Sequence, residues 1–244
     1  MRNSKRADLQ LVTSASPGDS LTGPVEDYLK AIYALGGGTD AVATNDIAQR
    51  LVVAPASVSG MVRRLAEQGL LSYERYRGVK LTISGRRAAL RTLRRHRVIE
   101  SYLSKALEYP WDRVHAEAER LEHAASDELV DRMAAAIGEP EVDPHGAPIP
   151  SRDGMVDETE YFPLAELGAG LGVRVVRVSD ADPEMLRYLG ELEITPGAEL
   201  LIVSKAPFDG PITLRIGVAL HSIGPALAAQ VLVEPLTDIE APAH

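Results

Sequence analysis

Apolar and polar positions alternate with helical spacing through the first part of the chain. Residues 25–35 (VEDYLKAIYAL) place apolar side chains three or four positions apart, which is typical of a helix with one buried face. The glycines at 36–38 predict its end. Thr44 and Asn45 are capping residue types and precede a second short helix, and residues 55–69 predict a third that ends at a glycine. Two short helices joined by a tight turn indicate a helix-turn-helix.

A hairpin and a long helix are expected next. Residues 70–73 and 79–83 can pair as two strands around a turn at 77–78. A hairpin in this place is the wing of a winged helix. The long helix is expected from Ser84 to Leu107.

The pattern changes near residue 138, after two further expected helices at 111–126 and 127–137. Residues 138–163 contain five prolines and three glycines and have no periodic apolar face, so they predict a linker or an irregular connection. Short strand-like runs and one helical segment then indicate a small barrel, SH3-like by size. The strand-like runs are 172–179, 198–206, 211–217 and 230–236, and the helical segment is 182–190.

The predicted fold class is therefore mainly α with small β parts. It combines an N-terminal winged helix-turn-helix, a helical domain and a C-terminal SH3-like β-barrel. The expected boundaries are a mobile arm at 1–21, a DNA-binding domain at 22–92, a helical domain at 93–139, a linker at 140–163 and the SH3-like domain at 164–241.

The composition restricts the chemistry and the compartment. The chain of 244 residues contains no cysteine, which excludes disulfides, thiolate metal sites and cysteine nucleophiles. It has no run of about 18 apolar residues, and its first twenty residues lack the apolar segment of a secretory signal. We therefore expect a cytoplasmic protein without a membrane partner.

Charge is distributed unevenly along the chain. Residues 44–99 carry twelve Lys and Arg but only three acids, a net charge of +9, whereas residues 100–244 have a net charge of −17. A basic block inside an acidic protein predicts an anionic polymer as partner. The alternative is a helix-rich domain that happens to contain many arginines.

The stretch HAEAERLEH, residues 115–123, is rich in histidine and glutamate side chains that can bind a metal. On a helix, His115, Glu119, Glu122 and His123 fall within an arc of about 100°, and Glu117 points to the opposite side. One interpretation is a solvated polar face. The other is that these side chains converge on a divalent metal, which requires further ligands because one helix cannot enclose an ion.

Additional ligand types lie elsewhere in the chain. His96 and Glu100 are four positions apart and share a helix face, and Asp27 lies on the first predicted helix. Taken singly, His96 could be a DNA-facing cation among arginines, and Asp27 an acid favoured by the helix dipole. Together these residues offer only oxygen and nitrogen donors, which suit Mn²⁺ or Fe²⁺ and also accept Zn²⁺, Co²⁺ and Ni²⁺. His145 and His221 match no ligand pattern and are left out.

A family resemblance covers nearly the whole chain. The segments VEDYLKAIYAL, LAEQGLL, YRGVKLTISGRRAAL, RRHRVIE, HAEAERLEH and DPHGAPIP, in this order and spacing, resemble the DtxR/MntR family of metal-dependent transcriptional repressors. The resemblance implies that residues 93–139 bind metal and dimerise and that the C-terminal domain is FeoA-like. It further implies a homodimer on palindromic double-stranded DNA, with two dimers per operator as an alternative, control of metal-homeostasis genes, and neither an organic cofactor nor enzymatic activity.

The resemblance also assigns two metal sites per subunit. They are His96, Glu100 and His115 for the first, and Asp27, Glu119, Glu122 and His123 for the second. Iron-responsive members have Met and Cys at the positions of Asp27 and Glu119, whereas manganese-responsive members have Asp and Glu. Hard oxygen ligands favour manganese. Mn²⁺ is therefore expected, Fe²⁺ is the alternative, and Zn²⁺, Co²⁺, Ni²⁺ or Cd²⁺ are substitutes.

Two departures from the family pattern stand out. Short manganese-sensing members carry another Glu one turn after the Asp, where this chain has Lys30, so their two-metal cluster cannot form unchanged. In three-domain iron sensors the C-terminal domain lends a Glu and a Gln to the first site. The nearest matches are Asp182, which is expected to be a ligand, and Met185, which is expected to be a core residue.

The third predicted helix is expected to lie on DNA. From Pro55 on it exposes Ala56, Ser57, Ser59 and Gly60, whose small side chains allow close approach to bases and phosphates. Gly60 replaces a larger polar residue of the family, so direct base reading should be modest. The expected phosphate contacts are Arg50, Arg63, Arg64, Arg77 and Lys80. For Arg63 and Arg64 the alternative is a solvated helix face.

Two other function classes are alternatives to a metal-dependent repressor: a metalloenzyme and a regulator that senses an organic ligand. A di-iron carboxylate enzyme would need two Glu-x-x-His pairs, and a zinc hydrolase of the HExxH type would need that motif; the chain has neither. The remaining alternative is a winged-helix regulator that senses an organic ligand and uses the acidic stripe only for structure.

Overall fold

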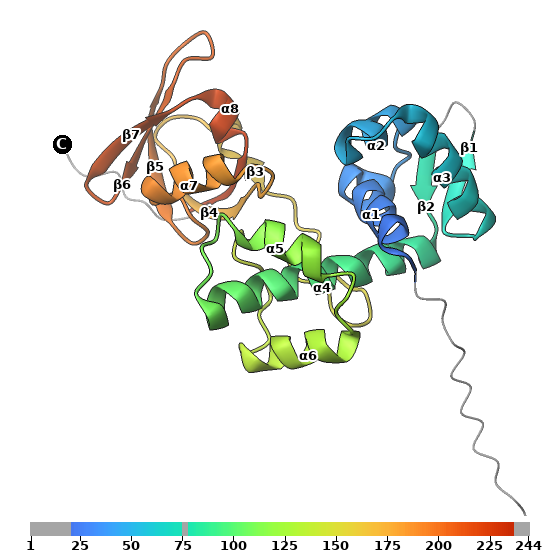
Figure 1. Ribbon diagram of the computed structural model, residues 1–244. Coiled ribbons are helices and arrows are strands. Elements are labelled where there is room, and N and C mark those ends of the chain that lie inside the picture. Colours follow the sequence, from blue (N-terminus) through green and yellow to red (C-terminus); the bar gives the residue numbers. More distant parts are fainter. Residues whose placement is uncertain (1–20, 75–77, 237–244) are drawn as a thin grey trace, which may run out of the picture.

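The computed structural model describes residues 21–74 and 78–236. It confirms the expected fold class, with a winged helix-turn-helix, a helical region and a C-terminal β domain. Figure 1 shows the winged-helix part over one end of the long helix α4 and the β domain towards its other end. Within the described part of the chain, no helix is both long and apolar enough to cross a membrane.

The winged-helix domain forms as the apolar spacing predicts. Its elements are α1 (Gly23–Ile32), the π-helical turn η1 (Tyr33–Gly37), α2 (Thr44–Leu51), α3 (Pro55–Glu67) and the antiparallel strands β1 (Leu71–Glu74) and β2 (Gly78–Leu81). Gly36 has a φ of 89°, which allows the chain to leave the first helix. Thr44 was expected to precede α2 but is its first residue, and the N-cap is Ala43, without a side-chain cap.

Helix α4 (Ile83–Leu107) runs without interruption across the expected domain boundary at 92/93. Its N-cap is Thr82, whose Oγ1 accepts a hydrogen bond of 3.1 Å from the backbone N–H of Gly85. The winged helix therefore continues directly into the helix that carries His96 and Glu100.

Two shorter helices complete the central region: α5 (Val114–Leu121) and α6 (Asp127–Ala136). Glu122 and His123 follow α5 in a turn, and Glu122 keeps helical angles (φ −59°, ψ −33°). The expected stripe is therefore retained, although its last two members lie beyond the helix end.

The segment between the helical and β domains contains no helix or strand from residue 138 to 161, as expected. Its first half is nevertheless packed against α4. Asp143 and His145 are buried, and the guanidinium groups of Arg94 and Arg97 donate hydrogen bonds to the carbonyls of Pro150 and Pro148. This part of the expected linker is a structural component of the central region.

The C-terminal domain is a six-stranded antiparallel sheet in the order β3-β8-β4-β5-β6-β7. The strands are β3 (Phe162–Pro163), β4 (Gly172–Val178), β5 (Glu199–Lys205), β6 (Ile212–Ile216), β7 (Ala219–Ile223) and β8 (Val231–Pro235), and the helices are η2 (Leu164–Glu166), α7 (Pro183–Glu191) and α8 (Pro225–Ala228). Strand β7 was not expected. It is a mostly exposed edge strand, so its sequence lacks the apolar alternation that marks the others.

Contacts of several kinds dock the β domain on the helical region. Trp111 packs against the apolar core of the β domain, and the backbone N–H of Val178 donates to the carbonyl of His145 at 2.9 Å. Gly146 lies so close to β4 that an added Cβ would be 2.0 Å from the carbonyl oxygen of Val176. The chain just after β4 is thereby placed beside α4 and α5.

Candidate metal centres and DNA-binding surface

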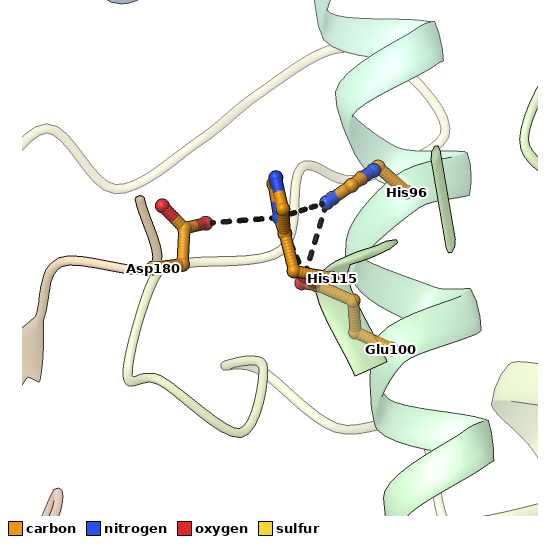
Figure 2. A group of neighbouring side chains, drawn as sticks. All are labelled: His96, Glu100, His115 and Asp180. Atoms are coloured by element: carbon orange, nitrogen blue, oxygen red, sulfur yellow. Dashed lines mark hydrogen bonds and ion pairs between the residues drawn. The ribbon is translucent and has the colours of Figure 1, made fainter. Parts of the chain in front are cut away.

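The residues expected for the first metal site lie together between α4, α5 and the chain after β4 (Figure 2). His96 Nε2 is 3.0 Å from Glu100 Oε1 and 3.1 Å from His115 Nδ1. His115 Nδ1 is also 3.5 Å from Asp180 Oδ2. The C-terminal domain thus contributes a carboxylate to this group.

That carboxylate belongs to Asp180 and not to Asp182, which was the expected ligand. Asp182 is exposed and caps α7, where its Oδ1 accepts hydrogen bonds from the backbone N–H groups of Glu184 and Met185. The structure therefore does not bring Asp182 into this group, and Asp180 lies where Asp182 was expected. The side chain of Met185 packs against the apolar core of the β domain, as expected.

Glu100 belongs to a second group of potential ligands, with Asp143 and His145. All three are buried, and His145 Nδ1 lies 3.9 Å from Glu100 Oε1. Glu100 Oε2, Asp143 Oδ2 and His145 Nδ1 have no hydrogen-bond partner among the described residues. Leaving buried polar atoms unpaired is costly unless something else satisfies them.

The sequence interpretation did not identify Asp143 and excluded His145, which lies in the loop Pro144–His145–Gly146, here called the PHG loop. Their only signal was the DPHGAPIP motif, which contributed to the family resemblance without indicating ligands. We call the two groups together the inner cluster: His96, Glu100, His115, Asp143, His145 and Asp180.

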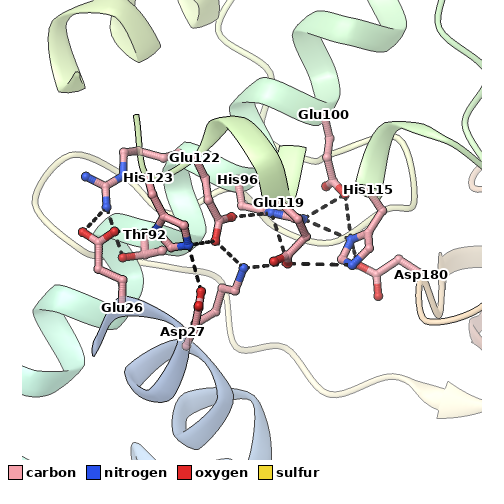
Figure 3. Close-up of polar contacts among 12 residues, drawn as sticks. Glu26, Asp27, Thr92, His96, Glu100, His115, Glu119, Glu122, His123 and Asp180 are labelled. Atoms are coloured by element: carbon pink, nitrogen blue, oxygen red, sulfur yellow. Dashed lines mark hydrogen bonds and ion pairs between the residues drawn. The ribbon is translucent and has the colours of Figure 1, made fainter. Parts of the chain in front are cut away.

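Three of the four residues expected for the second site, Asp27, Glu122 and His123, come together between α1 and the end of α5, whereas Glu119 groups with His96 and Glu122 (Figure 3). His123 Nε2 is 2.8 Å from Asp27 Oδ1 and 3.5 Å from Glu122 Oε1. Glu119 lies nearer the inner cluster, with its Oε1 3.8 Å from His115 Nε2. We call Asp27, Glu119, Glu122 and His123 the bridging cluster because they connect the winged helix to the central helices.

His96 belongs to both clusters through its two ring nitrogens. Its Nε2 faces Glu100, whereas its Nδ1 is 2.5 Å from Glu122 Oε2. The ring is 3% exposed, so it cannot turn towards solvent to separate these two roles.

Glu26 and Arg95 support the bridging cluster. The Oε2 atom of Glu26 is 2.7 Å from His123 Nδ1, and the guanidinium of Arg95 pairs with its Oε1. Glu26 was not expected to take part. It can fix the orientation of His123 while Nε2 of that ring faces Asp27, as carboxylates do behind metal-binding histidines.

Lys30 also contacts the bridging cluster. Its Nζ lies 2.7 Å from Glu119 Oε1 and 2.5 Å from Glu122 Oε1. The sequence identified Lys30 as a departure from the short manganese sensors but did not indicate that its ammonium reaches these two carboxylates.

The electrostatics of the clusters favour charged side chains. Burial lowers the pKa of His96, but hydrogen bonds with Glu100 and Glu122 outweigh this effect and raise it to about 10. Burial, together with the charge of Glu100, raises the pKa of Asp143 to about 6. The pKa of Glu100 is lowered, because hydrogen bonds from His115 and His96 outweigh the effect of burial. In this structure protonated imidazoles compensate the carboxylates.

The donor set suits a divalent cation. Both clusters contain only carboxylate oxygens and imidazole nitrogens. The ligand atoms lie within 4.8 Å of one another in each of four overlapping groups: His96–Glu100–His115–Asp180, Glu100–Asp143–His145, Asp27–Glu122–His123 and His96–Glu119–Glu122. Glu100 Oε2, Asp143 Oδ2 and His145 Nδ1 in the inner cluster accept no hydrogen bond from any described residue and so add capacity for a ligand. Such a set fits Mn²⁺, Fe²⁺ or Zn²⁺ and has no soft thiolate.

The surface expected to contact DNA is exposed along α3. Pro55, Ser57, Ser59 and Gly60 are all exposed, and an added Cβ at Gly60 would meet nothing within 4 Å. Ser59 Oγ donates to the carbonyl of Pro55 at 3.1 Å, within the helix. The surface is therefore open, but its hydroxyls present few strong donors to a base.

The basic residues of this region separate into two groups. Arg50, Arg63, Arg64 and Lys80 are exposed and have no ion pair with any residue that the structure describes, and Arg77 lies outside the described residues. The arginines of α4 are largely paired with acids instead. These pairs are Arg86–Glu158, Arg91–Asp127, Arg94–Asp131, Arg95–Glu26 and Arg97–Asp143. Much of the net charge of +9 is therefore internal to the fold, and the charge available to DNA lies mainly on the winged helix.

This combination defines a winged-helix protein with two clusters of potential metal ligands, and comparison with known proteins gives its family. The iron dependent repressor N-terminal DNA binding domain matches residues 20–79, the metal binding and dimerisation domain of the same repressors matches 82–151, and the FeoA domain matches 162–235. The chain belongs to the iron-dependent repressor family, which includes the DtxR and MntR proteins that its motifs resemble.

Individual relatives agree with this assignment. The iron-dependent repressor IdeR of Mycobacterium leprae (strain TN) is 31% identical over 229 residues, which are 88% of this chain and 99% of that protein. The regulator MntR of Lysinibacillus sphaericus (strain C3-41) is 34% identical over 48% of this chain and 83% of its own length. A solved manganese-dependent transcriptional repressor in complex with manganese is 41% identical, with a TM-score of 0.81 over 87% of this chain and all of the other.

Proposed function

We propose that the protein is a homodimeric, metal-dependent transcriptional repressor that binds double-stranded DNA and responds to manganese. The carrying observation is the pair of oxygen- and nitrogen-rich clusters, one of which joins the DNA-binding domain to the central helices. Membership of the iron-dependent repressor family supports DNA binding, dimerisation and metal dependence.

The proposed ligands follow the two clusters. In the inner cluster we assign His96, Glu100 and His115, with Asp180, Asp143 and His145 as additional donors. In the bridging cluster we assign Asp27, Glu119, Glu122 and His123. A divalent cation bound there would neutralise and cross-link carboxylates from different helices.

The bridging cluster explains how metal binding can favour DNA binding. Asp27 is on α1, which packs in the core of the winged helix, whereas Glu119 and Glu122 belong to α5 and its end. Holding these groups together restricts the position of the winged helix relative to the dimer. Metal can shift this equilibrium only through a higher affinity for the DNA-binding arrangement.

The metal preference rests on Asp27 and Glu119. Hard carboxylate oxygens at both positions favour Mn²⁺, although Fe²⁺ accepts the same donors. The relatives include both kinds: a manganese-dependent repressor among the solved structures and iron-dependent repressors among the curated proteins. An iron(II)-dependent repressor of iron uptake is therefore the second candidate.

On DNA, we assign the exposed face of α3 to the major groove of a palindromic operator. Ser57, Ser59 and Gly60 allow close approach, and we assign the exposed Arg50, Arg63, Arg64 and Lys80 to phosphate contacts. Such contacts predict affinity that falls steeply with salt. One or two dimers per operator are compatible with this arrangement.

The test is operator binding by chelator-stripped protein, titrated in parallel with Mn²⁺ and, under anaerobic conditions, with Fe²⁺. The probe is the palindromic region upstream of its own or a metal-transporter gene. Activation by Mn²⁺ at the lower free concentration supports the manganese assignment. Equal or better activation by Fe²⁺ supports the second candidate, an iron(II)-dependent repressor. If both metals leave DNA binding unchanged, the proposed function is wrong.

A further inference from the structure

The position of Lys30 in the bridging cluster has a consequence beyond the ligand assignment. Its ammonium lies within 2.7 Å of one carboxylate oxygen on each of Glu119 and Glu122, and its side chain is only 17% exposed. It reaches from α1 across to α5, as Asp27 does through His123. Lys30 is therefore a second tie between the two domains, made without a metal.

The charges of the cluster explain why a cation is needed at this point. Glu122 is completely buried, and its Oε1 has Lys30 as its nearest cationic partner. A buried carboxylate without a counter-charge is costly, and Lys30 supplies this charge at Oε1, beside His96, whose Nδ1 is 2.5 Å from Oε2 of the same side chain.

The same geometry makes Lys30 a competitor. A divalent ion bound by Glu119 or Glu122 requires metal–oxygen distances near 2 Å, and Lys30 already holds Oε1 of both side chains at hydrogen-bond distance. Two cations on the same oxygens repel one another strongly in a partly buried site. The flexible four-carbon stem of lysine allows its ammonium to move away when another cation binds.

We propose that Lys30 is a built-in counter-cation of the bridging cluster, which holds Glu119 and Glu122 in the metal-free protein and must be displaced when a divalent ion binds there. Its displacement sets the metal concentration at which the bridging site fills. The inference rests on the proposed metal site and adds a specificity-determining residue to it. It predicts opposite effects of removing Lys30 on metal-free stability and on metal affinity.

The test compares Mn²⁺ binding by chelator-stripped parent and Lys30→Met protein, in competition with a fluorescent divalent-metal chelator. Methionine keeps an unbranched stem but removes the charge. The expected result is a bridging site at least about tenfold tighter in Lys30→Met, with a lower melting temperature of the metal-free protein. Lys30→Arg keeps the charge and should retain weak binding, and Lys105→Met, at an exposed position on α4, should leave both measurements unchanged.

A double-mutant cycle ties the effect to the proposed contacts. In a Glu119→Gln background Lys30 loses one of its two partners, so the gain in affinity from Lys30→Met should be smaller than in the parent. Lys30→Gln, which keeps a hydrogen-bond donor, serves as the second neutral variant if Lys30→Met does not fold.

The outcomes separate this inference from the proposed function. If the parent binds two Mn²⁺ ions and neutral variants bind them equally or more weakly, the competition is refuted while the metal sites stand. A lower melting temperature without tighter binding would likewise reduce Lys30 to a structural tie. If the parent binds no Mn²⁺, the proposed function and this inference both fail.

Discussion

The inner and bridging clusters use the same kinds of side chain but differ in how they are compensated. The inner cluster lies within the helical region and its docked β domain, contains no lysine, and leaves three buried polar atoms without a hydrogen bond among the described residues, although Arg97 forms an ion pair with Asp143. The bridging cluster connects α1 to α5, and a lysine contacts two of its carboxylates.

This difference indicates a division of roles. A site made within one packed unit can stabilise that unit and the attachment of the β domain, but it does not directly restrict the position of the winged helix. A site between α1 and α5 joins the winged helix to the central helices, so under the proposed function binding there can be converted into a change in DNA affinity. We therefore expect the bridging cluster to control the response and the inner cluster to support it.

Loss of His96 should have the largest effect, because its ring nitrogens serve both clusters. His96→Ala is expected to weaken Mn²⁺ binding at both sites by on the order of 100-fold or more. Isothermal titration of chelator-stripped protein measures both affinities. His115→Ala is the matched variant and should weaken only the inner site; loss confined to one site in both variants would contradict the shared role of His96.

Glu119→Ala should separate the two clusters more cleanly. It removes a bridging carboxylate that is 39% exposed, so the fold should be retained while metal-activated operator binding falls about 10- to 100-fold. Operator binding against free Mn²⁺ measures the change. Asp143→Asn is the counterpart in the inner cluster and should alter the metal response less. If Glu119→Ala keeps the metal dependence of the parent, its assignment as a ligand is wrong.

Proton release should accompany metal binding at both clusters. The pKa of His96 is raised to about 10, so its ring carries a proton at pH 7 that must leave before it ligates, and the pKa values of His115 and His123 are raised in the same direction. Mn²⁺ affinity should therefore increase with pH, by about tenfold per pH unit for each proton released. Titrations in buffers of different ionisation enthalpy count these protons.

The stability of the metal-free protein should change with pH in the opposite direction. The raised pKa of His96 stabilises the fold fully below its ordinary value of 6.5, and this contribution is lost as the pH rises through about 10. Thermal melts of metal-free protein at pH 7 and pH 10 should show the decrease. The same melts with saturating Mn²⁺ should show a smaller one, and equal decreases would contradict the assignment of His96 as a ligand.

A substitution at Gly146 should affect the inner cluster indirectly and more weakly. An added Cβ would collide with the carbonyl of Val176, and the residue has a φ of 87°, which disfavours side chains. Gly146→Ala should loosen the β domain and reduce inner-site affinity by about a few-fold, with the bridging site unchanged. Gly138→Ala, also at positive φ but with open space around it, controls for backbone strain alone. Equal effects of both substitutions on inner-site affinity would contradict the idea that docking of the β domain supports this site.

The sequence allowed most of the fold to be predicted, and the reason is visible in particular elements. Helices α1, α3 and α4 have a strongly periodic apolar face, strand β8 alternates, and β4 is rich in valine although a register shift after Val175 interrupts its alternation, so local sequence indicated them. Strand β7 was not predicted because it is a mostly exposed edge strand and does not require alternating apolar and polar residues. Of the site residues, His96, Glu100, His115 and the bridging ligands were found because helical spacing and family motifs place them at recognisable positions.

The remaining features depended on long-range packing. Asp180 replaces Asp182 because the end of β4 is positioned by the PHG loop, whereas Asp182 is used to cap α7. Asp143 and His145 are candidate ligands because the segment that the sequence predicted as a linker packs beside Glu100. Lys30 and Glu26 acquired roles from side chains about 90 positions or more away in the sequence.

By itself, the sequence determined the family, the order of the three domains and the chemical nature of the ligands, because these properties follow from residue type and local spacing. The tertiary structure decided which carboxylate of the β domain reaches the inner cluster, that His96 serves both clusters, and that a lysine lies on the bridging carboxylates. These outcomes depend on how α1, α4, α5 and β4 pack in three dimensions, and no local periodicity records the distance between side chains on different elements.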